Sequence, residues 1–253
     1  MTRTTRKLSS TGVYHVMLRG INKQNIFEDR EDRIRFKTGL SDAKTKDGIK
    51  LFGYCLMSNH VHLMIKAEPD SLSRALKSIA GNYGHWFNMK YERCGTLFQD
   101  RFKSEPIETD AYWLVALRYI HQNPLKAGLC RRVDDYQWSS YKDYLGSGDG
   151  LTDTTEMLAM FASEPSLQVK LFKDFMEEES AQKLADFDDV VRFSERDAQE
   201  KMLEISGAKN VSEFQALSPE AQKQSAHLMR ATGISIRQIV RLTGMPFGLA
   251  RKA

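Results

Sequence analysis

The sequence predicts an α+β protein in which an antiparallel sheet with helices comes first and an all-helical region follows. Over residues 1–146, short apolar runs of strand type alternate with longer segments of helical periodicity. From residue 147 onward, only segments of helical type follow. We therefore divide the chain into residues 1–146, a helical extension or linker over residues 147–193, and a second helical region over residues 194–253.

The first region begins with a strand over residues 12–20, followed by an amphipathic helix over residues 29–47. Gly48 ends this helix, as glycine commonly does at a C-terminus. A second strand covers residues 50–57. Ser58 and Asn59 connect it to a third strand that reaches Ile65, so these two strands are predicted to form a hairpin.

Helix-capping residues and a helix-breaking proline predict the remaining elements of this region. A helix begins at the expected N-cap Ser71 and continues to about Lys90. An extended stretch covers residues 96–108. A further helix runs over Asp110–Gln122, with its first residue as the expected cap, and Pro124 cannot continue it. The first six elements match the split β-α-β-β-α-β order of ferredoxin-like folds.

The third strand carries two histidines on one face. Alternate side chains of a strand point to opposite faces, so His60 and His62 share a face while Val61 and Leu63 share the other. A sheet of this kind covers one face with helices, and we expect the histidines to look out of the open face. Two adjacent imidazoles can bind a divalent metal. The alternative is a half-exposed strand on which the histidines have no role.

The helix over residues 110–122 supplies a candidate nucleophile. Tyr119 and Asn123 are four residues apart and therefore neighbours on the helix surface. A tyrosine hydroxyl is a recognised covalent nucleophile, and an amide oxygen can complete a metal site. Taken singly, Tyr119 could instead be a half-buried ring at a domain edge, and Asn123 a helix C-cap.

Composition and charge narrow the class of protein. The chain has 253 residues with 41% hydrophobic residues, and it contains neither a run long enough to span a membrane nor a signal-peptide pattern. The three cysteines lie far apart, which favours the cytoplasm. Residues 1–146 hold 24 Lys and Arg against 16 Asp and Glu, a balance of +8, whereas the rest holds 13 against 17, or −4. The first region therefore suits a polyanionic partner, although mild basicity is common.

Taken together, the motifs resemble a known family. N-H-V-H-L-M over residues 59–64 resembles the HUH motif, in which two histidines flank an apolar residue. L-F-Q-D-R-F-K-S over residues 97–104 and R-Y-I-H-Q-N-P-L-K-A-G-L over residues 118–129 resemble further signatures of REP-associated tyrosine transposases. These are single-tyrosine HUH transposases of the bacterial insertion-sequence type. The resemblance covers residues 12–145 in the family's order.

The resemblance implies a ferredoxin-like fold, a divalent metal (Mg²⁺ or Mn²⁺), and cleavage and rejoining of single-stranded or hairpin DNA at repeated palindromic elements. It implies that His60, His62 and Asn123 are metal ligands and that Tyr119 is the nucleophile that forms a 5′-phosphotyrosine. It implies a monomer or homodimer at the bacterial nucleoid and leaves open whether the tyrosine serves its own subunit. His121 lies nearby in sequence but points to another side of the helix.

Basic and aromatic residues inside these motifs are candidate DNA contacts, because basic grooves with aromatic rings hold unpaired strands. We expect phosphate contacts from Arg19, Arg101, Lys103 and Lys126, and base stacking from Tyr14, Phe98 or Phe102. Solvated surface charge is the alternative for each basic residue.

Two other functions remain open. The chain could be a DNA-binding regulator without catalysis, derived from a transposase, or a metal-dependent phosphodiesterase that uses water. The last residues bear on the first of these. Helices predicted over residues 219–231 and 235–242 precede a turn at residues 244–246 and a short last helix, and they resemble a replication-initiator-like helix-turn-helix. Duplex DNA is the expected partner there, unless this is a truncated or purely structural bundle.

Overall fold

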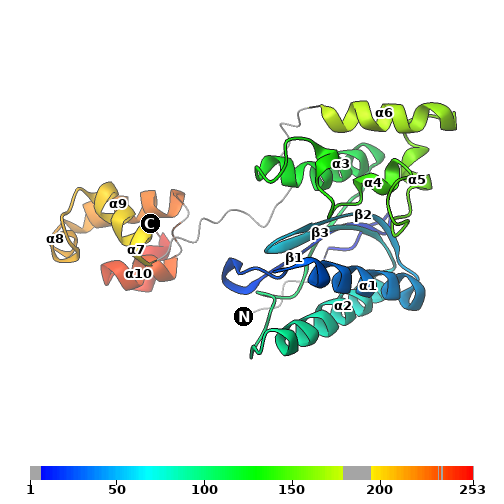
Figure 1. The fold of residues 1–253 in the computed structure, drawn as a ribbon. Coiled ribbons are helices and arrows are strands. Elements are labelled where there is room, and N and C mark those ends of the chain that lie inside the picture. The colour runs from blue at the N-terminus through cyan, green and yellow to red at the C-terminus, as the bar shows by residue number, and fades with distance from the viewer. Residues whose placement is uncertain (1–6, 179–194, 233, 235, 253) are drawn as a thin grey trace. The chain divides into compact units, whose positions relative to one another are not determined.

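The computed structural model describes residues 7–178, 195–232, 234 and 236–252. The chain divides into two compact units, residues 1–184 and residues 185–253, and each is described by itself. The first unit therefore extends beyond residue 146, which was the boundary that the sequence predicted. Figure 1 shows the helices and strands of both units.

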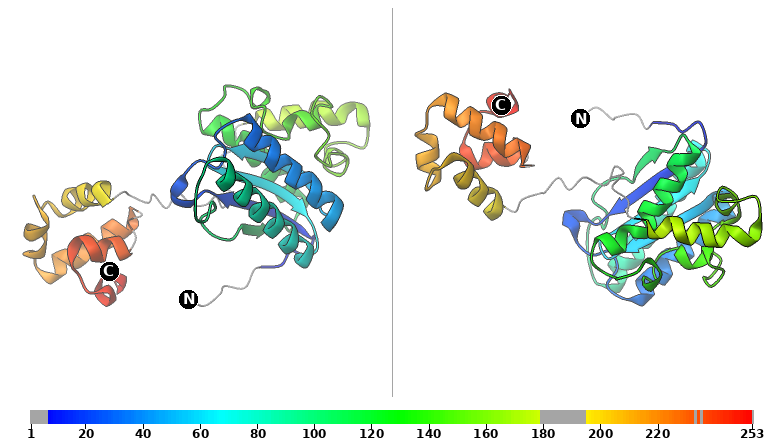
Figure 2. Two further views of the ribbon diagram at one scale, coloured as in Figure 1. Left: turned by 60° about the horizontal axis from the view of Figure 1, so that its bottom comes forward. Right: turned by 90° about the horizontal axis from the view of Figure 1, so that it is seen from above.

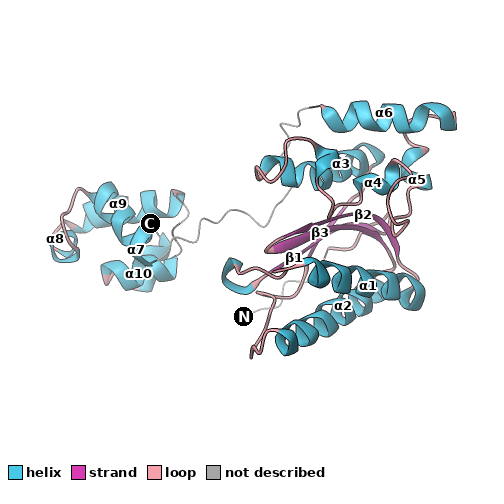
Figure 3. Ribbon diagram, in the orientation of Figure 1, coloured by secondary structure: helices cyan, strands magenta, loops and turns pink. Residues whose placement is uncertain are grey.

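The first unit contains a four-stranded antiparallel sheet with the order β2-β3-β1-β4. Its strands are β1 (Val13–Arg19), β2 (Lys50–Met57), β3 (His60–Lys66) and β4 (Lys103–Pro106). With helices between β1 and β2 and between β3 and β4, this arrangement confirms the predicted ferredoxin-like α+β fold. Figure 3 shows the curved sheet between two sets of helices.

Helices α1 (Arg30–Asp47) and α2 (Pro69–Lys90) cover one face of the sheet, where they bury the apolar sides of β1, β2 and β3. Helix α1 begins one residue after the predicted start, because Asp29 is its N-cap and forms a capping box with Asp32. The prediction for α2 was wrong: Ser71 lies inside the helix, whose N-cap is Glu68. Pro69 starts the helix because its fixed φ suits the first helical position and its missing N–H has no partner there.

The expectation that the second face of the sheet is open was also wrong. Helix α3 (Asp110–Lys126) lies across it, together with α4 (Tyr141–Tyr144), α5 (Thr155–Leu158) and α6 (Pro165–Glu177) (Figures 1 and 2). Phe52, Cys55 and Met64 of this face join a second apolar core with residues of α3 to α6. Apolar residues stand beside the histidines on this face, and burying them favours a covering layer.

Residues 147–178, predicted as part of an extension or linker, contribute directly to this second core. Met157 of α5 and Phe172 and Met176 of α6 are fully buried there. The side chain of Gln122 on α3 donates to the carbonyls of Met176 and Glu178, at 2.9 and 2.8 Å. These helices therefore belong to the first unit. Residues 179–193 of the predicted linker lie outside the described residues.

Gly53 on β2 allows α3 to approach the sheet. A Cβ atom at this position would lie 2.8 Å from Cδ1 of Leu117 on α3, closer than a carbon–carbon contact allows. The pairing of β2 with β3 is irregular between Leu51 and Gly53. Helix α3 can thus pack directly on β2, next to β3 with its two histidines.

Helix α3 starts and ends differently from the prediction. Its N-cap is Thr109, whose side chain accepts a hydrogen bond from the backbone N–H of Tyr112, so Asp110 is already helical. The helix also continues through Pro124 to Lys126. Hydrogen bonds from the N–H of Ala127 to Asn123 O and from that of Leu129 to Pro124 O close its last turn. Asn123 therefore lies inside the helix and not at its end.

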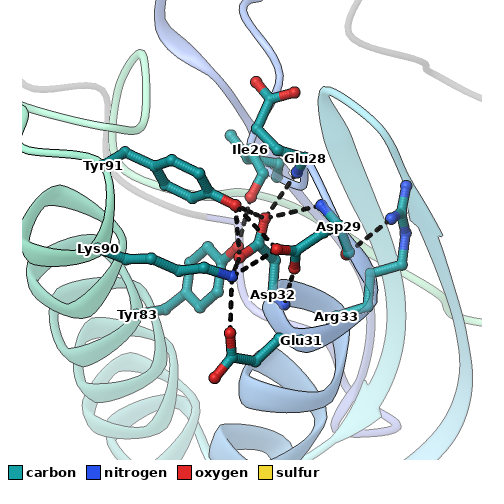
Figure 4. Close-up of polar contacts among 9 residues, drawn as sticks. All are labelled: Ile26, Glu28, Asp29, Glu31, Asp32, Arg33, Tyr83, Lys90 and Tyr91. Carbon is teal, nitrogen blue, oxygen red and sulfur yellow. Dashed lines mark hydrogen bonds and ion pairs between the residues drawn. The ribbon is translucent and has the colours of Figure 1, made fainter.

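A polar network fastens the loop after β1 to the ends of α1 and α2 (Figure 4). Lys90 on α2 bonds to Asp29 and Asp32 at 2.7 and 2.9 Å, and Tyr91 also donates to Asp32. Tyr83 donates to the carbonyl of Ile26. The same loop contains the short 3-10 helix η1 (Ile21–Lys23). Its N–H groups at Ile26 and Phe27 donate to the carbonyl of Ser58, so the network fixes backbone next to the β2–β3 turn.

The second unit is a bundle of short helices: α7 (Glu195–Ser206), α8 (Val211–Gln215), α9 (Pro219–Ala231), α10 (Ile236–Thr243) and α11 (Phe247–Lys252). Its core includes Met202, Phe214, Met229 and Ile239, all fully buried. The helices predicted over residues 219–231 and 235–242 and the short last helix are present. A left-handed Gly244 with φ 73° separates α10 from α11.

Among the described residues, every helix is too short or too polar to cross a membrane.

Candidate active site

The sheet register brings the predicted histidines beside a third one. His60, His62 and Met64 of β3 pair with Arg19, Met17 and His15 of β1. Directly paired residues of neighbouring strands point to the same face. Three imidazoles therefore share the face under α3, where His15 and His62 are fully buried and His60 is partly exposed.

The sequence did not single out His15. Its alternation with Met17 and Arg19 placed the three on one face of β1. That pattern cannot say which face of β1 aligns with the histidine face of β3, because the alignment depends on the register between strands that are distant in sequence. The sequence thus showed that His15 shares a face with Met17 and Arg19, and the strand pairing showed that this face carries His60 and His62.

His60 is held from its Nδ1 atom by the preceding residue. Nδ1 of His60 lies 2.6 Å from Oδ1 of Asn59, and the amide nitrogen of Asn59 donates to the carbonyl of Lys23 at 3.2 Å. The second bond sets the orientation of the amide, so its oxygen faces the ring. His60 therefore carries its proton on Nδ1, which leaves the lone pair on Nε2.

His62 is held from both ring nitrogens. Its Nδ1 lies 3.0 Å from Nε2 of His15, and the two rings stack with centroids 5.2 Å apart. Its Nε2 lies 3.1 Å from the side-chain nitrogen of Asn123 on α3. The structure thus places Asn123 beside one of the two predicted histidines. The ring of His60 is close as well, with its centroid 4.9 Å from that of His62.

Tyr119 lies against the same histidines within one chain. Its ring meets that of His62 edge to face at 5.6 Å between centroids, and that of His15 at 5.9 Å. The ammonium of Lys126 lies 5.3 Å from the centre of the tyrosine ring. Tyr119 is buried, with 5% of its surface exposed, because α3 presses this side of the helix onto the sheet.

Burial keeps the central histidines neutral. Desolvation lowers the pKa of His15 to about 4. The pKa of His62 is lowered well below its usual value by burial first, and then by the charges of His60, His15 and Arg19. At neutral pH both rings therefore lack a charge, and a neutral imidazole is the form that binds metal.

The two histidines of β3 can bind a divalent cation with a third protein ligand only if the Asn123 amide supplies it. Among the described residues, no three His, Cys, Asp or Glu side chains come together as a metal site. His60 and His62 can offer Nε2 lone pairs, and the Asn123 amide beside His62 can offer its oxygen once it is turned. The nitrogen and oxygen of an amide are assigned from such contacts, and turning the group exchanges them. Two imidazoles with one oxygen suit Mn²⁺ or Mg²⁺.

The predicted DNA contacts divide into two groups. Arg19 of β1 pairs with His60, and Lys103 of the neighbouring strand β4 pairs with Met17 of β1, so both belong to the histidine face. Lys126 ends α3 beside Tyr119, and Arg101 is exposed in the segment before β4.

The three aromatic residues predicted to stack on bases differ in their exposure. Tyr14 has 1% of its surface exposed and belongs to the core under α1 and α2, so the prediction that it stacks on bases was wrong. Phe98 and Phe102 are only partly buried and pack against that core. His121 points away from the site, as expected, and its Nε2 bonds to Ser140 Oγ at 2.8 Å.

The fold and this arrangement define a ferredoxin-like domain with a histidine and tyrosine cluster between its sheet and a covering helix. Residues 9–123 match the family model described as "Transposase IS200 like". The matched region runs from the entry to β1 as far as Asn123 and contains all the clustered residues named above except Lys126. Over these residues the chain is similar to the IS200-like transposase family.

A solved structure of a REP-associated tyrosine transposase bound to a REP hairpin shares the fold. Its TM-score is 0.54 at 14% identity, and the alignment covers 73% of this chain and 96% of that one. No curated protein matches the chain. The family match and the shared fold confirm the resemblance that the motifs predicted.

Proposed function

We propose that the first unit cleaves and rejoins single-stranded DNA through a covalent bond to Tyr119. The observation that carries this proposal is the contact of the Tyr119 ring with the ring of His62 in a single chain, 5.6 Å between centroids. A nucleophile and a phosphate-binding group must lie this near each other for attack at one phosphorus atom. The match of residues 9–123 to a transposase family model supports the same reaction class.

The reaction balances without an external energy source. The Tyr119 oxygen forms a bond to phosphorus as the bond from phosphorus to the 3′ oxygen breaks. The phenol gives up its proton and the departing 3′ oxygen gains one, which leaves a 5′-phosphotyrosine and a free 3′ hydroxyl. The phosphodiester energy is retained in the new bond, so a 3′ hydroxyl can attack in reverse and rejoin the strand.

A divalent cation held by His60, His62 and Asn123 would supply Lewis-acid stabilisation of the phosphate oxygen and would orient the phosphate. Burial keeps the ring of His62 neutral, and His15 and Asn59 hold the Nδ1 atoms of His62 and His60. Arg19 and Lys103 on the histidine face, with Lys126 and Arg101, would bind the neighbouring phosphates.

Hairpin DNA is the proposed substrate. The solved structure that shares the fold is bound to a REP hairpin, and this is the support for the substrate class. The short turn between α10 and α11 and the six basic residues after Pro219 favour duplex DNA as a partner of the second unit.

The test is a search for a covalent product. The full chain is incubated with labelled hairpin oligonucleotides of random flanking sequence and Mn²⁺, and the products are separated on denaturing gels. We expect a protein-linked strand from the wild type and none from Tyr119→Phe. Tyr112→Phe is the matched control, because Tyr112 lies on α3 outside the histidine contacts, and it should keep the adduct.

Each other result identifies a different function. An adduct that persists in Tyr119→Phe contradicts the assigned nucleophile. Cleavage without a protein-linked strand indicates a phosphodiesterase that uses water. DNA binding without cleavage, unchanged by Tyr119→Phe, indicates a regulator without catalysis.

A further inference from the structure

The two histidines of the H-x-H motif are held by different kinds of partner. The amide that holds His60 belongs to Asn59 and is itself fixed by the carbonyl of Lys23. The partner that holds His62 is the imidazole of His15, which comes from another strand. An amide oxygen can only accept a hydrogen bond, whereas an imidazole nitrogen can donate or accept one according to its tautomer. The tautomers of His15 and His62 are therefore coupled.

The proton positions follow from the contact at the other end of the ring. With the Asn123 amide as this structure has it, its nitrogen lies 3.1 Å from Nε2 of His62 and donates, so this Nε2 accepts. A cation bound at Nε2 would take the place of this N–H and would face the amide oxygen once the group is turned. A neutral imidazole has one proton, which must then lie on Nδ1 of His62. This proton is donated to Nε2 of His15, 3.0 Å away. The single proton of His15 is thereby left on its Nδ1.

That last atom is buried and has no hydrogen-bond partner in the described part of the chain. The residue opposite His15 on β4 is Glu105, whose Oε2 is likewise buried without a partner. An unsatisfied buried polar group costs about 1–3 kcal/mol. A phenylalanine at position 15 would fill a similar space without this cost. A purely structural role does not account for a histidine here, but a role for its Nε2 does.

We propose that His15 is a positioning residue, which holds His62 with its proton on Nδ1 and its Nε2 lone pair directed toward Asn123. This inference rests on the proposed function, because the lone pair matters only if the site binds a cation. In the opposite arrangement, Nε2 of His15 would carry the proton, and His62 would be protonated on Nε2 and closed to metal. Outer partners of this kind commonly fix the tautomer of metal-binding histidines.

The first measurement needs neither metal nor DNA. Nitrogen-15 NMR of the full chain reports which ring nitrogen of His62 carries the proton. We expect the Nδ1–H form in the wild type and in His15→Gln, whose side-chain oxygen can reach the place of the histidine Nε2. We expect the Nε2–H form, or a mixture, in His15→Phe, because Nδ1–H of His62 loses its acceptor and the Asn123 amide can turn its oxygen toward Nε2. A wild-type His62 protonated on Nε2 overturns the proposal even if no variant folds.

The second measurement is titration with Mn²⁺ alone, followed by calorimetry. Loss of an outer partner typically weakens metal binding about 10–100-fold, which we expect for His15→Phe, with most of the affinity restored in His15→Gln. The matched control is His121→Phe, because His121 is also fully buried but bonds to Ser140 and not to His62. This control should leave both the tautomer of His62 and the Mn²⁺ affinity unchanged.

The outcomes separate this inference from the proposed function. Wild-type affinity and an unchanged tautomer in His15→Phe would refute the role of His15. An equal loss in His121→Phe would also refute it, since any buried histidine would then serve. If the wild type binds no Mn²⁺, the proposed metal-dependent function fails, and the tautomer in the metal-free protein still decides whether His15 positions His62.

Discussion

The two faces of the sheet are built from the same strands but bury different kinds of side chain. Under α1 and α2, the strands contribute apolar side chains such as Val61, Leu63 and Ile65, all fully buried. Under α3, the same strand β3 contributes His62, also fully buried. Burial alone stabilises the first face, whereas a buried imidazole must find polar partners.

The difference shows how a site acquires defined chemistry. Apolar side chains need only to fill space, so their neighbours are interchangeable within limits of volume. The histidines need donors or acceptors at fixed points, and Asn59, His15 and Asn123 provide them. Those contacts determine the proton positions of the rings. Three predictions test this contrast, in order of decreasing effect on stability.

The largest expected change in the free energy of unfolding comes from lowering the pH. Burial lowers the pKa of His15, under α3, to about 4 and that of His121, on α3 itself, to about 3. The folded protein therefore binds fewer protons than the unfolded chain below about pH 6.5. The stability from neutral burial is complete above that pH and is lost as the pH falls through about 4. We expect a decrease in the free energy of unfolding on the order of several kcal/mol.

Denaturant unfolding at pH 7 and pH 4.5 measures this decrease. The ion pair of Asp29 with Lys90 should contribute little over this range, because the hydrogen bond from Lys90 holds the pKa of Asp29 at about 2. Removing one buried histidine by His121→Phe should make the pH dependence shallower. A stability that is flat between the two pH values would contradict the burial of neutral rings.

The next effect concerns the apolar face. Leu63→Ala removes a fully buried side chain from the core under α1 and α2, and we expect a loss of about 2–5 kcal/mol. Urea unfolding measures it. The folded fraction should still form the DNA adduct, since the histidine contacts lie on the opposite face. Leu129→Ala, at a leucine with 52% of its surface exposed, is the control and should change stability by less than about 0.5 kcal/mol.

The smallest effect concerns the approach of α3. In Gly53→Ala, the new methyl group would lie 2.8 Å from Cδ1 of Leu117, and the shift it forces should cost about 1–3 kcal/mol. Because α3 carries Tyr119, adduct formation per folded molecule should also fall. Gly81→Ala is the matched control: its methyl group meets nothing within 4 Å, and this change inside α2 should stabilise by up to about 1 kcal/mol. Equal stability of the two variants would show that α3 is not in close contact with the sheet.

Local patterns in the sequence were sufficient for most of the elements. Alternation placed His60 and His62 on one face of a strand, and four-residue spacing placed Tyr119 beside Asn123, because both relations are fixed by backbone geometry. The motifs also predicted the family. Helix boundaries were less reliable: Thr109 and Glu68 replaced the expected caps, and α3 continued past Pro124, since neighbouring contacts outweigh a single local preference.

The sequence by itself determined the elements, the face that carries the two histidines and the likeness to a transposase. Only the tertiary structure decided that this face is covered and that His15 meets His62, a contact between residues 47 positions apart. The reason is that strand register and the packing of α3 join distant segments, and no local periodicity specifies which distant side chains will meet.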